Sequence, residues 1–280
     1  MEKFAVIGHP IGHTMSPFIH KSLFNINGID VEYSAIDIPP CALSEEFNGK
    51  LLDLKGFNVT IPHKESIIPL LDGIDDSATK YNAVNCVKHE NGKFYGCSTD
   101  AYGFKKSLES NDISLKGNIL ILGAGGAAAT LAREAVDNGG CVTIAARESG
   151  INKALALGER LQTLSKDVHV TTLDNINGTF DLCVNATPVG MYPNTGISAV
   201  GHEVLANCSA VFDAVYNPTQ TEFMKIAESL GLKIIGGMEM LVWQAVKAHE
   251  FWYGGTFMEC DVKEIIETAK IEMERIFHAK

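Results

Sequence analysis

The sequence predicts an α/β protein of two domains, each built around a mostly parallel sheet. Short β-branched or apolar runs recur along the chain, and most are followed by amphipathic stretches long enough to form a helix. A glycine-rich turn also opens the second series of strands, between one apolar run and one helical pattern. The expected strands are Phe4–Ile7, Val31–Ile36, Gly56–Val59, Asn118–Leu122, Cys141–Ala145, Val168–Thr171, Asp181–Val184, Ala210–Val215 and Lys233–Ile235.

One segment interrupts this alternation of strands and helices. Two strand-like runs, Ala83–Lys88 and Lys93–Gly96, flank His89-Glu-Asn-Gly92. Asn-Gly between two such runs is a strong hairpin signal. We therefore expect a hairpin at the edge of the first sheet.

The change of domain is expected in the helix that begins near Thr99-Asp100, shortly before the second strand series opens at Lys116. Two helical patterns, 240–253 and 261–277, end the chain with no strand after them, so they could return to the first half. We expect one domain over residues 1–100, completed by helices within 238–280, and a second over residues 101–237.

Composition excludes several classes of partner. The 34 acidic and 23 basic residues give a net charge of −11, without a long run of lysine or arginine, so nucleic acid is not an expected partner. No apolar run approaches the roughly 20 residues that span a bilayer, and the first residues lack the layout of a signal peptide. We expect a cytoplasmic protein without a membrane partner, whose seven cysteines are reduced core residues.

The glycine-rich turn has the pattern Gly123-Ala-Gly125-Gly126-Ala-Ala128, after a strand and before a helix rich in small residues. In this Gly-x-Gly-x-x-Ala spacing, Gly123 allows the tight turn and Gly125 lets backbone N–H groups approach a pyrophosphate. Ala128 permits close packing of helix on strand, and the helix N-terminus favours an anion. The pattern predicts a Rossmann-type dinucleotide-binding domain.

The residues after the next strand indicate which dinucleotide is preferred. NAD sites carry an acidic residue about 20 residues after the glycines, for the ribose 2′-hydroxyl. Here the first candidate is Arg147, whose guanidinium suits a 2′-phosphate, so NADP is favoured over NAD. Glu148, beside it, could take the acidic role instead.

Several short clusters together resemble shikimate dehydrogenases over nearly the whole chain. Each could occur by chance, but their order along the chain is specific. They are Ile7-Gly-His-Pro-Ile-Gly-His-Thr14-Met-Ser16, Asn58-Val-Thr60-Ile-Pro-His-Lys64, Ala83-Val-Asn85, Gly96-Cys-Ser-Thr-Asp100, the glycine turn, Asn185-Ala-Thr187-Pro-Val-Gly190-Met191, Asp213-Ala-Val-Tyr216-Asn-Pro and Gly237-Met-Glu-Met-Leu-Val-Trp-Gln244.

The resemblance implies a substrate domain, then an NADP domain, and reversible reduction of 3-dehydroshikimate to shikimate in aromatic amino acid biosynthesis. It implies Lys64 and Asp100 as the catalytic pair, with either as the carrier of the proton. The implied substrate contacts are Thr14, Ser16, Thr60, Asn85, Tyr216 and Gln244. The implied cofactor contacts are Gly123, Ala124, Gly125, Gly126, Ala127, Ala146, Arg147, Thr187, Gly190, Met191, Ala214 and Gly237.

These residue types suit the ligand that the resemblance implies. Shikimate carries three hydroxyls and a carboxylate, which call for neutral hydrogen-bonding groups such as the Thr14 and Ser16 hydroxyls. After hydride transfer, the C3 oxygen needs a proton that Lys64 can supply. Without the resemblance, Ser16 and Asp100 would be interpreted as helix caps and Lys64 as a solvated charge.

Other interpretations remain open. The family usually has serine where Thr14 stands, so quinate, with one more hydroxyl at the carboxylate-bearing carbon, is an alternative substrate. A catalytically silent NADP-binding sensor is a second alternative.

Two other interpretations are not favoured by the sequence. Tyr102 and Lys106 have the spacing of short-chain dehydrogenases, but Tyr102 precedes the glycine turn rather than following it. His9 and His13 are four residues apart, yet Pro10 and Gly12 oppose a shared helix, so no metal is expected. The protein is expected to be a monomer or a homodimer.

Overall fold

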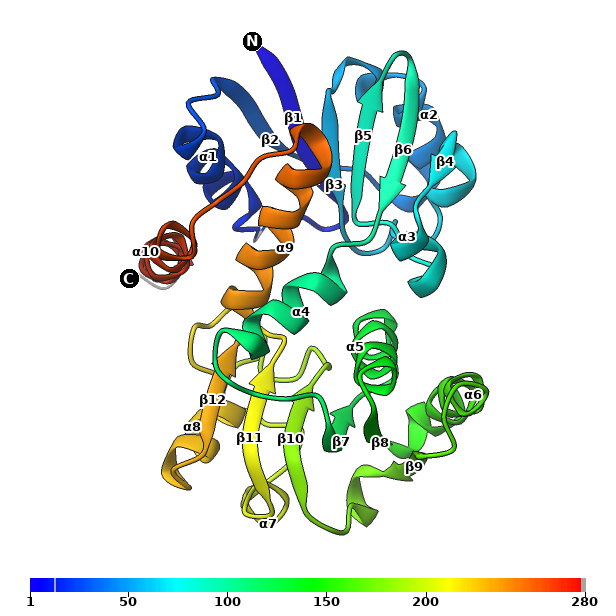
Figure 1. The fold of residues 1–280 in the computed structure, drawn as a ribbon, viewed down its shortest axis with the longest axis vertical. Helices are drawn as coiled ribbons and strands as arrows, with labels where there is room; N and C mark the ends of the chain where they lie inside the picture. The colour runs from blue at the N-terminus through cyan, green and yellow to red at the C-terminus, as the bar shows by residue number, and fades with distance from the viewer. Residues whose placement is uncertain (13, 278–280) are drawn as a thin grey trace. The chain divides into compact units, whose positions relative to one another are not determined.

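A computed structural model describes residues 1–12 and 14–277, so His13 lies outside the described residues. The chain divides into two compact units (Figure 1), one formed by Met1–Gly103 with Val242–Lys280 and the other by Phe104–Leu241. The helices α4 (Asp100–Glu109) and α9 (Gly237–Tyr253) each cross a boundary between the units. The functional boundaries expected at residues 100 and 237 stay a prediction.

The first unit contains a six-stranded mixed sheet in the order β2-β1-β3-β5-β6-β4. β1 is parallel to β2 and β3, whereas β5 is antiparallel to both β3 and β6, and β4 is parallel to β6. Its strands are β1 (Glu2–Gly8), β2 (Val31–Asp37), β3 (Gly56–Val59), β4 (Gly73–Ile74), β5 (Cys86–Glu90) and β6 (Lys93–Cys97). The sheet is therefore parallel in three of its five neighbouring pairs, and β5 is the strand that runs antiparallel to both of its neighbours.

The expected hairpin is confirmed, but its expected position at the sheet edge is wrong. β5 and β6 pair through Glu90 and Lys93, and the two residues between them have positive φ angles, 53° at Asn91 and 72° at Gly92. A two-residue turn of this kind matches the twist of the strands that it joins. The edge is formed by β4, whose two residues are too few to carry an alternating pattern.

Helices and short 3-10 turns cover this sheet. Asp75 caps α3 because its Oδ1 accepts a hydrogen bond from Ala78 N at 2.9 Å, and Asn82 ends the helix with a φ of 50°. The α-helices of the first unit are α1 (Ser16–Ile26), α2 (Leu43–Phe47), α3 (Asp76–Tyr81), α10 (Glu259–Phe277) and the parts of α4 and α9 that belong to it. The 3-10 turns are η1 (Pro40–Ala42), η2 (Lys50–Asp53) and η3 (Ile68–Leu70).

The helix α9 contacts the sheet of the first unit. Trp252 on α9 donates its indole N–H to Val87 O on β5 at 2.9 Å, and its ring lies 4.8 Å from that of Phe4 on β1. Gly56 on β3 allows this approach, since a Cβ there would lie 2.7 Å from the indole nitrogen. Trp252 and Ala248 of α9 thus belong to the buried core of the first unit.

The second unit contains a six-stranded sheet in which all neighbours are parallel, in the order β9-β8-β7-β10-β11-β12. Counted from β7, this is the 3-2-1-4-5-6 order of the Rossmann fold. The expected dinucleotide-binding fold is therefore confirmed. Its strands are β7 (Gly117–Leu122), β8 (Gly140–Ala146), β9 (Val168–Thr172), β10 (Phe180–Asn185), β11 (Cys208–Asp213) and β12 (Lys233–Gly236).

Helices follow the strands of the second unit in alternation, except after β9, and residues of the strands are buried in clusters on both faces of the sheet. They are α5 (Gly126–Asp137), α6 (Ile151–Gln162), α7 (His202–Leu205) and α8 (Glu222–Ser229), with the turns η4 (Glu148–Gly150) and η5 (Leu173–Asn175). Across the described residues of both units, no helix is long and apolar enough to cross a bilayer. All seven cysteines are unbridged; Cys41 and Cys260 are exposed rather than in the core.

Candidate active site

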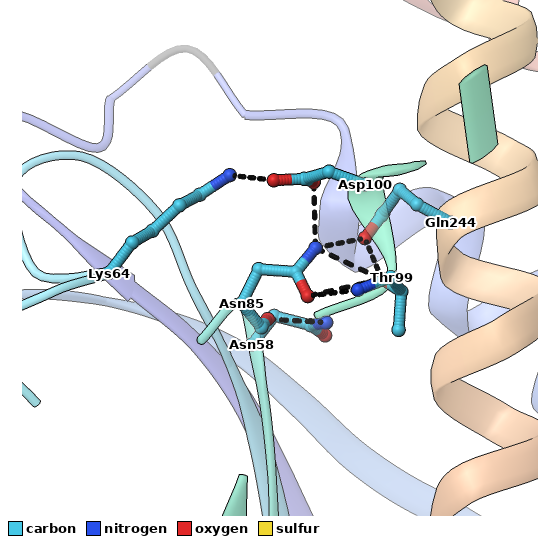
Figure 2. Close-up of polar contacts among 6 residues, drawn as sticks. All are labelled: Asn58, Lys64, Asn85, Thr99, Asp100 and Gln244. Atoms are coloured by element: carbon cyan, nitrogen blue, oxygen red, sulfur yellow. Dashed lines mark hydrogen bonds and ion pairs between the residues drawn. The ribbon is translucent and has the colours of Figure 1, made fainter. Parts of the chain in front are cut away.

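Lys64 lies in the loop that follows β3, and its backbone is held on both sides. The preceding residue, His63, is buried with its Nε2 2.6 Å from Ile38 O. Lys64 O accepts a hydrogen bond from Val84 N at 2.8 Å, which fixes the lysine beside the segment that leads to Asn85. Its Nζ lies 2.5 Å from Asp100 Oδ2 (Figure 2), and the two side chains are 29% and 18% exposed, so a ligand can reach them.

Asn85 is the centre of the hydrogen-bonded group around this ion pair. Its Nδ2 donates to Asp100 Oδ1 at 2.7 Å and lies 2.9 Å from Thr99 Oγ1. Its Oδ1 accepts from Thr99 N at 2.7 Å. Gln244 on α9 joins the group, with its Oε1 3.3 Å from Asn85 Nδ2 and 3.2 Å from Thr99 Oγ1. The predicted residues Lys64, Asn85, Asp100 and Gln244 are therefore brought together (Figure 2).

Thr99, Asn58 and Tyr33 belong to this group but were not among the predicted site residues. Asn58 Nδ2 donates to Asn85 O at 3.3 Å, and Asn58 Oδ1 accepts from the Tyr33 hydroxyl at 2.7 Å. Thr99 and Asn58 lie within the clusters Gly96–Asp100 and Asn58–Lys64 that resemble the family, so their sequence positions could have indicated a place in the site. Tyr33 on β2 carries no such signal, because its contact depends on how the strands align.

Asp100 is the first residue of α4, where the positive end of the helix dipole stabilises a negatively charged side chain. The hydrogen bonds described for its carboxylate go to Lys64 and Asn85. This geometry favours a site residue over a helix cap. Ser16 likewise begins α1, whose N-cap residue, Met15, makes no side-chain cap hydrogen bond.

Thr14 and Ser16 form a separate hydroxyl pair. Thr14 Oγ1 donates to Ser16 Oγ at 3.1 Å and accepts from Ser16 N at 3.2 Å. Thr60 follows β3, and its methyl group packs close to Gly8. A Cβ at Gly8 would lie 2.4 Å from Thr60 Cγ2. Tyr216 belongs to the second unit, so its predicted contact with the substrate stays a prediction.

The glycine turn of the second unit is built to receive an anion. Gly123 has a φ of +107°, and a Cβ there would lie 2.9 Å from Thr187 Cγ2. Gly125 precedes α5 without any side-chain cap, and a Cβ at Gly125 or Gly126 would meet nothing within 4 Å. The first N–H groups of α5 are therefore open to a phosphate, which fits the predicted dinucleotide. Ala124 lies in the turn, and Ala127 is the second residue of α5.

The end of β8 carries the residues predicted to select NADP. Ala146 is the last residue of the strand, and Arg147 and Glu148 follow it with exposed side chains. Within the described residues, no ion pair is recorded between Arg147 and an acidic side chain. The guanidinium is thus available to a ligand, and Glu148 is close to it in sequence.

The remaining predicted cofactor contacts lie at the ends of β10, β11 and β12. Thr187 is held by Asn185, whose Oδ1 accepts from the Thr187 hydroxyl at 2.6 Å. A Cβ at Gly237 would lie 2.5 Å from Ala214 O, so only glycine allows these two segments to come so close. Gly190 has a φ of +89°, and Met191 beside it is 46% exposed.

Comparison with known proteins identifies the family. A family model described as the shikimate dehydrogenase substrate binding domain matches residues 6–87. A curated protein of Caldanaerobacter subterraneus subsp. tengcongensis, named shikimate dehydrogenase (NADP(+)), is 40% identical over an alignment of 267 residues, which covers 91% of this chain and 92% of the relative. The chain belongs to the shikimate dehydrogenase family.

Solved structures of shikimate dehydrogenases have the same fold. That of Thermus thermophilus, in complex with NADP(H) and shikimate, has a TM-score of 0.86 and 33% identity, covering 96% of this chain and all of the other. That of Listeria monocytogenes, in complex with shikimate and NAD, has a TM-score of 0.83 and 28% identity, covering 95% and 96%. The two complexes differ in the dinucleotide that they contain.

Two features weighed in the sequence now have structural places. Tyr102 and Lys106 lie on α4, where Lys247 Nζ stands 5.3 Å from the Tyr102 ring. His9 contacts Asp37, with Nδ1 3.1 Å from Oδ1. Among residues 1–12 and 14–277, no group of three or more potential metal ligands is found.

Proposed function

We propose that this protein is an NADP-dependent shikimate dehydrogenase, which reduces 3-dehydroshikimate reversibly to shikimate. The observation that carries the proposal is the Lys64–Asp100 pair, 2.5 Å apart and joined through Asn85 to Gln244. A shikimate dehydrogenase needs an acid–base group beside neutral hydrogen-bonding side chains, and this group contains both. Family membership over nine-tenths of the chain supports the same activity.

Each residue of the first unit has a distinct role in the proposed reaction. The Lys64 ammonium donates a proton to the C3 oxygen as the carbonyl is reduced and takes it back in the reverse direction. Asp100 holds that ammonium in place and balances its charge, and Asn85 orients the carboxylate of Asp100. Gln244 and Thr60 bind ring hydroxyls, Tyr216 of the second unit contributes a further contact, and the Thr14 and Ser16 hydroxyls bind the carboxylate.

The second unit is proposed to bind NADP, which supplies the hydride. The open N–H groups after Gly125 bind the pyrophosphate, and Arg147 pairs with the 2′-phosphate. The segments around Thr187, Ala214 and Gly237 bind the other end of the dinucleotide. The first unit is then the substrate domain and the second the NADP domain. A cytoplasmic location and a monomeric or homodimeric state are part of the same proposal.

The test is the initial rate of absorbance change of the reduced nicotinamide. Purified protein is given shikimate or quinate with NADP or NAD, in all four pairings. The proposal predicts that shikimate with NADP is fastest. A preference for quinate would indicate that Thr14 changes the substrate, a preference for NAD would remove the role of Arg147, and tight NADP binding without turnover would support a sensor.

A further inference from the structure

Two fully buried polar residues stand side by side at the ends of two strands of the second unit. Asn185 ends β10 and Asp213 ends β11, and the two are direct partners in the parallel register. Both are 0% exposed. A buried carboxylate is costly unless it is fully hydrogen-bonded, so its presence here calls for a reason.

Asp213 joins three separate segments of the chain. Its Oδ1 accepts from Asn185 Nδ2 at 2.9 Å and from Val215 N at 3.0 Å, and its Oδ2 accepts from the Thr221 hydroxyl at 2.5 Å. Thr221 in turn caps α8 by accepting from Met224 N at 3.3 Å. One carboxylate therefore fixes the segment after β11 and the start of the following helix.

Asn185 extends this connection to the segment after β10. Its Oδ1 accepts from Thr187 N at 3.1 Å and from the Thr187 hydroxyl at 2.6 Å, and its Nδ2 lies 3.3 Å from Val189 O. The two segments are also joined farther along, where Tyr192 N donates to Asn217 O at 2.9 Å. Asn185 and Asp213 thus set the relative position of the segments 186–192 and 214–217.

These segments lie on the nicotinamide side of a doubly wound sheet. In such a sheet the dinucleotide crosses the point where the strand order reverses, which here is between β7 and β10. The pyrophosphate belongs to the turn after β7 and the adenosine ribose to the end of β8, where Arg147 stands. The ends of β10 and β11 are therefore left for the nicotinamide nucleotide.

We propose that Asn185 and Asp213 are positioning residues that hold the two segments in contact with the nicotinamide end of the cofactor. This inference rests on the proposed function. Hydride transfer requires the nicotinamide ring to be held within a fraction of an ångström, whereas the adenosine end only needs to be bound. A rigid buried pair under these two segments serves the first requirement and leaves the second untouched.

The cost of this arrangement agrees with a positioning role. Burial raises the pKa of the Asp213 carboxyl to about 6, although hydrogen bonds from Thr221, Val215 and Asn185 act in the opposite direction. Well-packed apolar residues often stabilise a core as well as buried charges do or better. What the carboxylate adds is directional hydrogen bonding to three segments at once.

The experiment compares binding of the two ends of the cofactor. Asp213→Ala and Asn185→Ala are measured for kcat with shikimate, for NADPH affinity by nicotinamide fluorescence, and for affinity to adenosine 2′,5′-bisphosphate, which lacks the nicotinamide. Both variants should lower kcat by about ten- to a hundredfold and weaken NADPH binding, with unchanged affinity for the bisphosphate. Asp213→Asn should recover most of the activity, because its amide oxygen still accepts from Asn185 and Val215 and the Thr221 hydroxyl can accept from its amide group.

The control variant is Asp181→Asn, which alters a carboxylate at the opposite end of β10 that accepts from Asn118 N at 2.7 Å. It should change none of the three quantities. Parallel loss of NADPH and bisphosphate affinity in the alanine variants would overturn the inference in favour of general damage, and so would unchanged kcat and NADPH affinity. If Asp213→Ala does not fold, Asn185→Ala gives the same comparison with Asp213 still bonded to Thr221. If the wild type bound NADPH but did not oxidise shikimate, the proposed function would fail while the two affinities still decided this inference.

Discussion

A buried pair of histidines in the first unit should make the protein sensitive to mild acid. His20 on α1 and His249 on α9 are both 0% exposed, with His20 Nδ1 2.9 Å from His249 Nε2. His249 Nδ1 is hydrogen-bonded to the Tyr253 hydroxyl. Within the described residues, His20 Nε2 is buried without a hydrogen-bond partner, so the favoured tautomer has His20 donating from Nδ1 and His249 donating to Tyr253. Protonating either ring would place two donors face to face or bury a charge.

The size of the effect follows from the pKa of His249. Burial lowers this pKa from an ordinary value of 6.5 to about 3, and burial together with His249 lowers the pKa of His20. Between pH 6.5 and about pH 3, His249 binds a proton in the unfolded chain but not in the folded chain, so falling pH favours unfolding. Each pH unit in this window is worth about 1.4 kcal/mol, so His249 alone should cost about 2 kcal/mol between pH 6.5 and pH 5.

The assay is urea unfolding of the wild type and of His249→Gln at pH 6.5 and pH 5. Other groups titrate in this window, including Asp213, whose raised pKa acts in the opposite direction, but those that do not contact His249 are common to both proteins and cancel in the comparison. The wild type should lose about 2 kcal/mol more than the variant. His169→Gln changes an exposed histidine on β9 and should keep the wild-type dependence. Equal pH dependence in the wild type and His249→Gln would refute the reasoning.

Two further predictions concern the second unit. Arg147→Ala should raise the KM for NADP with little effect on the KM for NAD, because only NADP carries the 2′-phosphate. Glu148→Gln should lower the KM for NADP, because it removes a negative charge near that phosphate. Steady-state kinetics with both cofactors test the two variants, and an unchanged KM for NADP in either variant would contradict the role given to that residue. Gly237→Ala should lower the free energy of unfolding, measured in urea, by about 1–3 kcal/mol, since the added Cβ would lie 2.5 Å from Ala214 O. The control is Gly150→Ala, which should be nearly neutral because the nearest atom to its added Cβ is 3.7 Å away.

The second unit could be predicted largely from sequence because parallel strands covered on both faces read as continuous apolar runs. The glycine turn then fixed the place of β7 and α5. The first sheet was harder. β4 has only two residues, so it carries no pattern, and the hairpin of β5 and β6 was for that reason predicted at the edge that β4 occupies.

The candidate site could be predicted only in part. Residue spacing alone does not distinguish Asp100 from a helix cap or Lys64 from a solvated charge, so those residues were assigned through family resemblance. Tyr33 could not be predicted, because its hydrogen bond to Asn58 joins β2 to β3 across β1. The connection between Asn185 and Asp213 likewise depends on the register of β10 and β11, which local sequence does not fix.

The central claim is that Lys64 transfers the proton in shikimate oxidation by NADP. The most direct measurement is the initial rate of NADP reduction by shikimate in the wild type and Lys64→Ala, with Lys93→Ala, at an exposed lysine of the hairpin, as the control. The account predicts turnover by the wild type and Lys93→Ala, and a kcat lower by about 10²–10⁴ in Lys64→Ala with a nearly unchanged KM for shikimate. A Lys64→Ala variant with wild-type kcat, or one changed only in KM, would contradict it.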